Sequence, residues 1–377
     1  MTRITEVGVA LHQRARAFAK GASGGTVGVL TIVTESGHES TVFVSGAQTV
    51  PELNVRALAE LVRPQLVGLD ALDIGAIWER LWKQERALNS VVIGAVDTAL
   101  WDIAGQVAGL PIHRLLGTVR HEIPAYVSSW LHEHPEDYAA EAAHYQQLGF
   151  TAYKFHPTTQ WRSRGGRNVP LSEDILTARL VREAVGPDMK LMFDSPLVYS
   201  YEEAVTMGKV LEELDYHWYE DPLPPDDIYG YQRLRQQLRI PLLATEMTGG
   251  GPYAYAPWIL GSATDYLRGD VAFKGGITPL MKIARTAELF RLGFELHDGF
   301  NATGNLAGAH VAMAVPNGQF FEILTIQDTG VYGFDNFNYG LAEPIAIVDG
   351  KVQAPTGAGL GHALDHELIQ SGIIATY

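Results

Sequence analysis

Three carboxylates stand at equal intervals in the middle of the chain, each at the end of a short apolar run. Asp194 ends KLMFD, Glu220 ends HWYE and Glu246 ends PLLATE, and both steps are 26 residues long. Hard carboxylate oxygens without imidazole or thiolate suit Mg²⁺. The spacing therefore predicts a magnesium site, although one such acid alone would more simply be a solvated strand end or a salt-bridge partner.

Further ionisable residues continue this pattern along the chain. Asp270, His297 and Glu322 follow at steps of 24, 27 and 25 residues. A carboxylate beside an imidazole orients the ring and tunes its pKa, so Asp270 and His297 are predicted to form a catalytic dyad rather than a satisfied core pair. Lys154 and His156 lie two residues apart in TAYKFH, so their side chains would share one face of a strand as further acid–base candidates.

These groups indicate proton removal next to a carboxylate. That step places two negative charges on one small group, and it is prohibitive at neutral pH unless something absorbs them. A divalent cation held by the three acids would stabilise the charge as it develops. The predicted chemistry is therefore cation-assisted deprotonation of a small-molecule carboxylate.

The elements that must position these residues alternate between strand and helix. One strand, its loop and a helix packed back across a parallel sheet need roughly the observed spacing. From Ile123 onward we read eight strands: IPAYVSS, TAYKFH, KLMFD, HWYE, PLLATE, YLRGDVA, FELHD and QFFEIL. Eight such units with their polar ends on one side favour an α/β fold closed into a TIM-type barrel.

The flanking segments have different patterns. Residues 1–50 alternate as antiparallel strands around the turn at 35–38, and residues 51–117 are helical in pattern. Near the C-terminal end, IAIVDGKVQAP is typical of a hairpin around Asp349 and Gly350. These segments are expected to lie outside the barrel.

Composition narrows the class of protein. The 377 residues are 46% hydrophobic, and no apolar stretch approaches the roughly 20 residues that span a bilayer, so we expect no membrane insertion. A formal net charge of −15 argues against binding to nucleic acid. The chain has no cysteine and no signal-peptide pattern at its N-terminus, which fits a cytoplasmic location.

Together these motifs resemble the enolase superfamily, specifically its mandelate racemase subgroup. The resemblance rests on Asp194, Glu220-Asp221-Pro222, Glu246, Asp270 with Gly275-Gly276-Ile277-Thr278, His297, and the segments Ala95–Gly117 and Asp349–Gly361. It covers nearly the whole chain. It implies a modified (β/α)₇β barrel over residues 121–340, and an α+β capping domain formed by residues 1–120 with residues 341–377 returning to it. We also expect a homo-oligomer.

Two departures from the family pattern affect the expected roles. The second strand usually carries two lysines, whereas here His156 stands in place of the second. It could act as acid or base, or only donate a hydrogen bond to a substrate hydroxyl. The family also tends to have asparagine two residues after the first metal ligand, where this chain has Pro196. Asp270 itself separates the chain from the muconate-lactonising branch, which has lysine there.

The resemblance gives Glu322 the role of an acid that hydrogen-bonds the substrate carboxylate. That role requires the protonated form, which burial and a neighbouring negative charge would favour. The alternative is a barrel-rim acid paired with lysine or arginine. Under the first reading, Glu322→Gln would largely preserve activity.

Two loops are candidates for contact with substrate. Arg162, Arg164 and Arg167 surround a Gly-Gly pair after the second strand, and such arginines suit an anionic or polyhydroxylated substrate, or else an oligomer interface. The glycine-rich loop at residues 20–25 is a candidate lid.

The expected activity is dehydration of a sugar acid to a 2-keto-3-deoxy acid, catalysed by a hydro-lyase. The alternatives are a racemase, epimerase or cycloisomerase acting through the same enediolate, and a non-catalytic barrel. The sequence leaves the particular sugar acid open.

Overall fold

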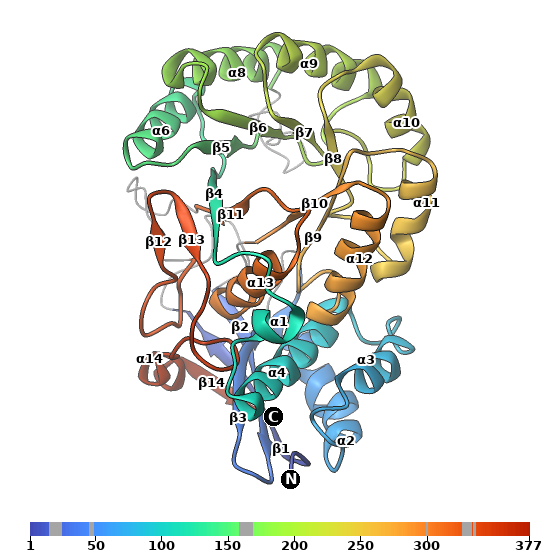
Figure 1. Cartoon of the computed structure of the whole chain (residues 1–377), viewed down its shortest axis with the longest axis vertical. Coiled ribbons are helices and arrows are strands. Elements are labelled where there is room, and N and C mark those ends of the chain that lie inside the picture. Colours follow the sequence, from blue (N-terminus) through green and yellow to red (C-terminus); the bar gives the residue numbers. More distant parts are fainter. Residues whose placement is uncertain (15–24, 45–48, 158–168, 299–300, 326–333, 335–336) are drawn as a thin grey trace.

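The computed structural model describes residues 1–14, 25–44, 49–157, 169–298, 301–325, 334 and 337–377. The arginine loop with Arg162, Arg164 and Arg167 lies outside these ranges, as does the candidate lid except for its last glycine. All eight strands predicted from the sequence are present, and they form the staves of one barrel (Figure 1).

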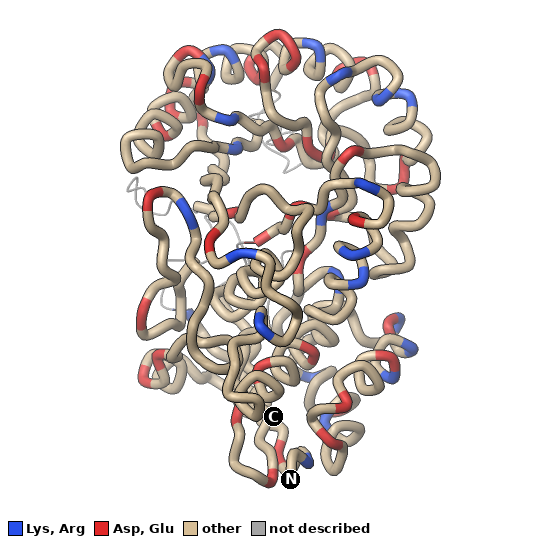
Figure 2. The backbone as a smooth tube through the Cα atoms, in the orientation of Figure 1, with Lys and Arg blue, Asp and Glu red and all other residues tan. Residues whose placement is uncertain are grey.

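The barrel strands are parallel neighbours in chain order. They are β4 (Glu122–Ser128), β5 (Ala152–Phe155), β6 (Lys190–Asp194), β7 (Trp218–Glu220), β8 (Leu242–Ala244), β9 (Tyr266–Gly269), β10 (Gly293–Leu296) and β11 (Phe321–Leu324). The surrounding helices are α6 (Pro135–Gln147), α8 (Leu171–Val185), α9 (Tyr201–Glu213), α10 (Ile228–Gln237), α11 (Tyr255–Leu260), α12 (Ile277–Leu289) and α13 (Ala302–Ala314), with a 3₁₀ turn η2 (Gly251–Ala254) before α11. Figure 2 shows acidic and basic positions interspersed along these outer helices.

The two edges of the barrel sheet close differently. β11 pairs in parallel with β4, and the hairpin of β12 (Ile347–Val348) and β13 (Lys351–Gln353) extends the first half of β4. Between β10 and β11 the buried side chain of Glu295 takes the place of a ladder, because its two oxygens accept the backbone N–H groups of Gln319 (2.9 Å) and Phe320 (3.2 Å). Burial raises the pKa of Glu295 to about 8.

A second sheet lies below the barrel in Figure 1. It is antiparallel, in the order β14 (Ile373–Thr376), β1 (Ile4–Gln13), β2 (Thr26–Thr34) and β3 (Glu39–Val44). Its helical partners are α1 (Pro51–Ala57), the π-helix η1 (Leu58–Val62), α2 (Arg63–Leu66), α3 (Ile74–Trp82), α4 (Ser90–Ala108) and α5 (Ile112–Leu116), and α14 (His366–Ser371) precedes β14. Because β14 pairs with β1, the final stretch returns to the N-terminal sheet. The boundaries at residues 120 and 340 stay a prediction.

Helix α4 corrects one expectation about hydropathy. It is 19 residues long with a mean hydropathy of 1.3 over an 18-residue window, so its length and composition would suffice to cross a bilayer. Within the structure, 72% of that window is buried. At Gly94 the helix approaches the barrel so closely that an added Cβ would lie 2.3 Å from the carbonyl oxygen of Val271.

Helix α4 also fixes the loop that follows β9. The Asp97 carboxylate accepts the Thr278 N–H (2.9 Å) at the start of α12, and Gly276 is required there because its φ is +117° and an added Cβ would lie 2.3 Å from Asp97 Oδ2. Trp78 Nε1 donates to the Gly275 carbonyl (2.8 Å). The capping elements therefore hold in place the loop that begins at Asp270.

Candidate active site

The three equally spaced carboxylates converge at the C-terminal ends of β6, β7 and β8. One oxygen from each of Asp194, Glu220 and Glu246 lies within 4.8 Å of the other two. Asp194 and Glu220 are buried, and 16% of the Glu246 side chain is exposed. The predicted cluster is therefore present, and it opens toward solvent at Glu246.

Two buried cations lie against this cluster. Lys154 Nζ is 2.9 Å from Asp194 Oδ2, 3.1 Å from Glu220 Oε2 and 3.0 Å from Glu322 Oε1. Arg268 Nε is 2.5 Å from Glu220 Oε1, and its Nη2 is 2.5 Å from Glu322 Oε2. With Glu246 included, four carboxylates face two buried cations, so carboxylates outnumber lysine and arginine here by two.

The protonation states follow from these contacts. Burial opposes a charged Lys154 and so does Arg268, but the surrounding carboxylates outweigh both and raise the pKa of Lys154 well above its ordinary value. These contacts favour the ammonium form of Lys154 in the metal-free protein, and its role as an acid or base stays a prediction. Burial raises the pKa of Glu220 to about 7, against the opposing effect of Arg268.

The contacts of Glu322 differ from those expected of a neutral donor. Burial would favour the protonated carboxyl, but Arg268 and Lys154 both contact it and hold the pKa of Glu322 well below its usual range. Its Oε2 also accepts the Asp298 N–H (3.1 Å). These contacts fit the alternative, an acid paired with lysine or arginine, and the role of Glu322 in the reaction stays a prediction.

Glu322→Gln is accordingly expected to lower the free energy of unfolding of the metal-free protein by about 3–5 kcal/mol, because it removes one partner of a buried ion pair. Urea denaturation measures this change. The control is Glu122→Gln, which removes the exposed partner of Lys351 and should leave the unfolding midpoint almost unchanged. If the Glu322→Gln protein is as stable as the wild type, that result would support a protonated, neutral Glu322 instead.

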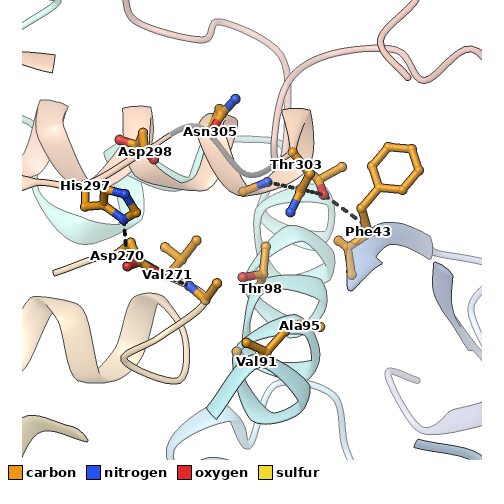
Figure 3. A pocket seen from close by; sticks show the side chains of 15 residues that line it. Phe43, Val91, Ala95, Thr98, Asp270, Val271, His297, Asp298, Thr303 and Asn305 are labelled. Carbon is orange, nitrogen blue, oxygen red and sulfur yellow. Dashed lines mark hydrogen bonds and ion pairs between the residues drawn. The ribbon is translucent and has the colours of Figure 1, made fainter. Parts of the chain in front are cut away.

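The predicted dyad is formed at the ends of β9 and β10. His297 Nδ1 lies 3.0 Å from Asp270 Oδ2, while Asp270 Oδ1 accepts the N–H groups of Ala272 (2.8 Å) and Phe273 (2.6 Å). His297 Nε2 is turned toward the cluster, 3.5 Å from Glu246 Oε1. Figure 3 shows the dyad beside a small cavity that also borders α4. Asp270 thus orients the ring so that Nε2 faces the carboxylates.

The charge on His297 should respond to a bound cation. Burial lowers its pKa, but Glu246, the hydrogen bond to Asp270 and Glu322 outweigh burial and raise the pKa to about 9. In the metal-free protein the ring is therefore protonated at pH 7. A divalent cation at Glu246 would offset that charge, so we expect the pKa of His297 to fall toward neutrality when Mg²⁺ is added. Imidazole ¹⁵N NMR titrations with and without Mg²⁺ measure this shift, and an unchanged pKa would contradict a cation at Glu246.

His156 lies on the opposite side of the cluster from His297. Its Nδ1 is 2.6 Å from the Ser129 carbonyl oxygen, and its Nε2 is 3.1 Å from Asp194 Oδ2. Both partners are acceptors, so the ring can donate a hydrogen bond toward either of them. Whether His156 acts as an acid or a base, or only as a hydrogen-bond donor, stays a prediction.

Reasoning from the sequence missed Arg268. Its side chain is fully buried, and besides its carboxylate partners it donates from Nη1 to Tyr126 Oη (3.0 Å) and to the Leu296 carbonyl (2.9 Å). The sequence did contain a clue to Arg268. In YLRGD it precedes Asp270 by two residues, so the two side chains would lie on the same face of the strand. The buried Lys274, four residues after Asp270, was missed as well.

The residues present fit a divalent cation. The cluster supplies three hard oxygen donors within reach of one point, and carboxylates outnumber the lysine and arginine cations around it. Burying such charges together is costly unless a cation compensates them. Asp194, Glu220 and Glu246 are therefore the residues that would hold a metal ion.

Fold and site together define a class: a parallel-barrel enzyme with an acidic cluster at the C-terminal strand ends and one imidazole on each side of it. Comparison with known families agrees. Residues 4–117 match the mandelate racemase / muconate lactonizing enzyme N-terminal domain, and residues 137–368 match the enolase C-terminal domain-like family. The chain therefore belongs to the mandelate racemase / muconate lactonizing enzyme family of the enolase superfamily, which confirms the resemblance.

Individual relatives lie at about 30% identity. Arabinonate dehydratase of Saccharolobus solfataricus is 30% identical over 85% of this chain and 82% of its own length. D-galactarolactone cycloisomerase of Agrobacterium fabrum is 30% identical over 81% of both chains. Among solved structures, D-glucarate dehydratase from Agrobacterium tumefaciens, complexed with magnesium, aligns with a TM-score of 0.86 at 29% identity over 99% of this chain and 100% of its own. Its fold confirms the predicted capped barrel.

Proposed function

We propose that the protein is a Mg²⁺-dependent hydro-lyase that removes the proton alpha to the carboxylate of a sugar acid and expels the beta-hydroxyl as water. The product is a 2-keto-3-deoxy acid. One observation carries the proposal: two imidazoles flank the acidic cluster, with His297 oriented by Asp270 and His156 placed as a donor. Dehydration needs such a base and such an acid.

In this proposal Asp194, Glu220 and Glu246 hold the cation. When bound, it supplies Lewis-acid stabilisation of the negative charge that develops on the substrate carboxylate. His297 takes the alpha proton on Nε2, while Asp270 keeps the proton on Nδ1. His156 gives a proton to the beta-hydroxyl as its C–O bond breaks, so one water leaves and an enol remains, which tautomerises to the keto acid.

The two buried cations assist this chemistry through charge. Lys154 and Arg268 lie among carboxylates that raise the pKa of both, so in this proposal neither moves a proton. They limit the negative potential that an anionic substrate meets at the cluster. The names of the relatives support a sugar acid as substrate, since they include arabinonate, D-xylonate and D-gluconate dehydratases.

A second candidate is a cycloisomerase, racemase or epimerase acting through the same enediolate. Two relatives are cycloisomerases, at 30% and 28% identity. Racemisation needs a base on each face of the substrate carbon, and Lys154 or His156 would have to serve opposite His297. The dehydratases among the relatives favour the hydro-lyase.

Incubation of the Mg²⁺-loaded enzyme with a library of acid sugars in deuterated water tests the proposal. A hydro-lyase gives a keto-acid product with loss of water, whereas an epimerase or racemase incorporates deuterium without that loss. Turnover of none of the acids, with Mg²⁺ bound, would support the non-catalytic barrel. The cytoplasmic location, the homo-oligomer and the absence of nucleic-acid or membrane partners stay predictions.

A further inference from the structure

Lys274 is a buried ammonium whose partners are backbone carbonyls. Lys274 is 1% exposed, and its Nζ donates to the carbonyl oxygens of Thr245 (2.9 Å), Glu246 (2.8 Å) and Thr248 (2.8 Å). An ammonium has three N–H donors, so these bonds use all of them. None of the ion pairs found among the described residues includes Lys274, and the mechanism above gives it no task.

The backbone around these carbonyls departs from ordinary geometry. Consecutive carbonyls of an extended chain point in opposite directions, yet those of Thr245 and Glu246 accept from the same atom. Thr245 has a φ of +91°, which is a genuine outlier for a β-branched residue. Its hydroxyl secures this conformation by accepting the Arg268 N–H (2.9 Å) and donating to the Arg268 carbonyl (3.0 Å). The loop is thus held in a strained form, as is common at functional sites.

We propose that the carbonyl oxygens of residues 245, 246 and 248 form a monovalent-cation cradle, that the Lys274 side chain occupies it, and that Lys274 is thereby the positioning residue for Glu246. Rings of backbone carbonyls are also the means by which proteins bind K⁺. The face of Tyr255 adds to the cradle, since Nζ lies 5.4 Å from its ring centroid, within the range of a cation–π interaction.

Because of its position in the chain, Lys274 connects the cradle to the loop that carries Asp270. Lys274 lies in the loop that begins at Asp270, and its N–H donates to the Asp270 carbonyl (3.2 Å). One side chain therefore joins the loop of the dyad carboxylate to the loop of a cluster carboxylate. The relative placement of Glu246 and His297 depends on this joint, and its effect on catalysis rests on the proposed function.

The test compares two variants that empty or block the cradle. Lys274→Ala leaves it empty and able to admit an ion, whereas Lys274→Met fills it with an uncharged chain. Each metal-free protein is melted in KCl, in NH₄Cl and in choline chloride at equal ionic strength. We expect Lys274→Ala alone to gain about 2–4 °C in Tm with K⁺ or NH₄⁺ over choline, as for a weak site approaching saturation. Lys209→Ala, on the exposed face of α9, should match the wild type in every salt.

A second measurement is the kcat/KM of the Mg²⁺-loaded enzyme. In choline chloride, kcat/KM of Lys274→Ala should fall by about 100-fold, the effect of a misplacement near 1 Å, and NH₄⁺ should restore part of it. Lys274→Met should show the loss without restoration. If no substrate is found, the melting experiment still decides, so failure of the proposed function is distinguishable from failure of the cradle. Identical melting of Lys274→Ala and Lys274→Met in all three salts, or aggregation of Lys274→Ala in all of them, would overturn the proposal.

Discussion

Glu246→Gln is expected to weaken Mg²⁺ binding more than 100-fold, because even residues behind the ligands of a metal are worth about 10–100-fold in affinity. Glutamine keeps the shape of the side chain and an oxygen acceptor for Arg268 Nε, which lies 3.0 Å from Glu246 Oε2. It removes one of the three negative charges in the cluster. Isothermal titration calorimetry of the purified protein with MgCl₂ measures the change, and turnover should be lost with it.

The matched control is Glu213→Gln on α9, where the side chain is 66% exposed and pairs only with Arg179 among the described residues. That variant should bind Mg²⁺ like the wild type. Wild-type affinity in Glu246→Gln would show that the cation does not use the third carboxylate. The proposed metal site would then consist of Asp194 and Glu220 without Glu246.

His297→Asn is expected to separate catalysis from cation binding. The variant should slow exchange of the alpha proton by about 10²–10⁴-fold, the usual contribution of a positioned acid or base. Asparagine can still donate to Asp270, so the loop after β9 keeps its partner. Mg²⁺ affinity should stay close to that of the wild type. Exchange into deuterated water, followed by NMR, measures the first quantity, and calorimetry measures the second.

The comparison for this variant is His156→Asn, on the other side of the cluster. If His156 only donates a proton to the leaving hydroxyl, its replacement should reduce loss of water much more than alpha-proton exchange. Undiminished exchange in His297→Asn, together with lost exchange in His156→Asn, would transfer the role of base to His156.

The positions of the candidate residues could be predicted because a parallel barrel gathers the C-terminal ends of its strands. Asp194 and Glu220 are the last residues of buried strands and Glu246 lies two residues beyond a third, so even spacing along the chain becomes proximity in space. The same logic placed Asp270 beside His297 on neighbouring strands. The spacing of these residues and the ends of the apolar runs in the sequence were sufficient to predict their positions.

The charge states could not be predicted, because they depend on partners from distant strands. Glu322 on β11 meets Lys154 from β5 and Arg268 from β9 only after the barrel has closed. The sequence shows each of these residues but not their contacts. For this reason the contacts that favour the charged forms of Glu322 and Lys154 became evident only from the structure.

The pairing of β14 with β1 has a consequence for the order in which the molecule assembles. From β4 to β10 each barrel strand pairs with the next strand along the chain, so most of these contacts close short loops and can form early. The register that joins Ala10 to Thr376 must instead bridge almost the entire sequence. Such a closure is slow, and the sheet that it completes also carries the helices over the mouth of the barrel. We expect newly made molecules to pass through an intermediate in which the barrel has formed but the antiparallel sheet and its helices have not yet packed over it. In that intermediate the acidic cluster would be accessible to water and to chaperones.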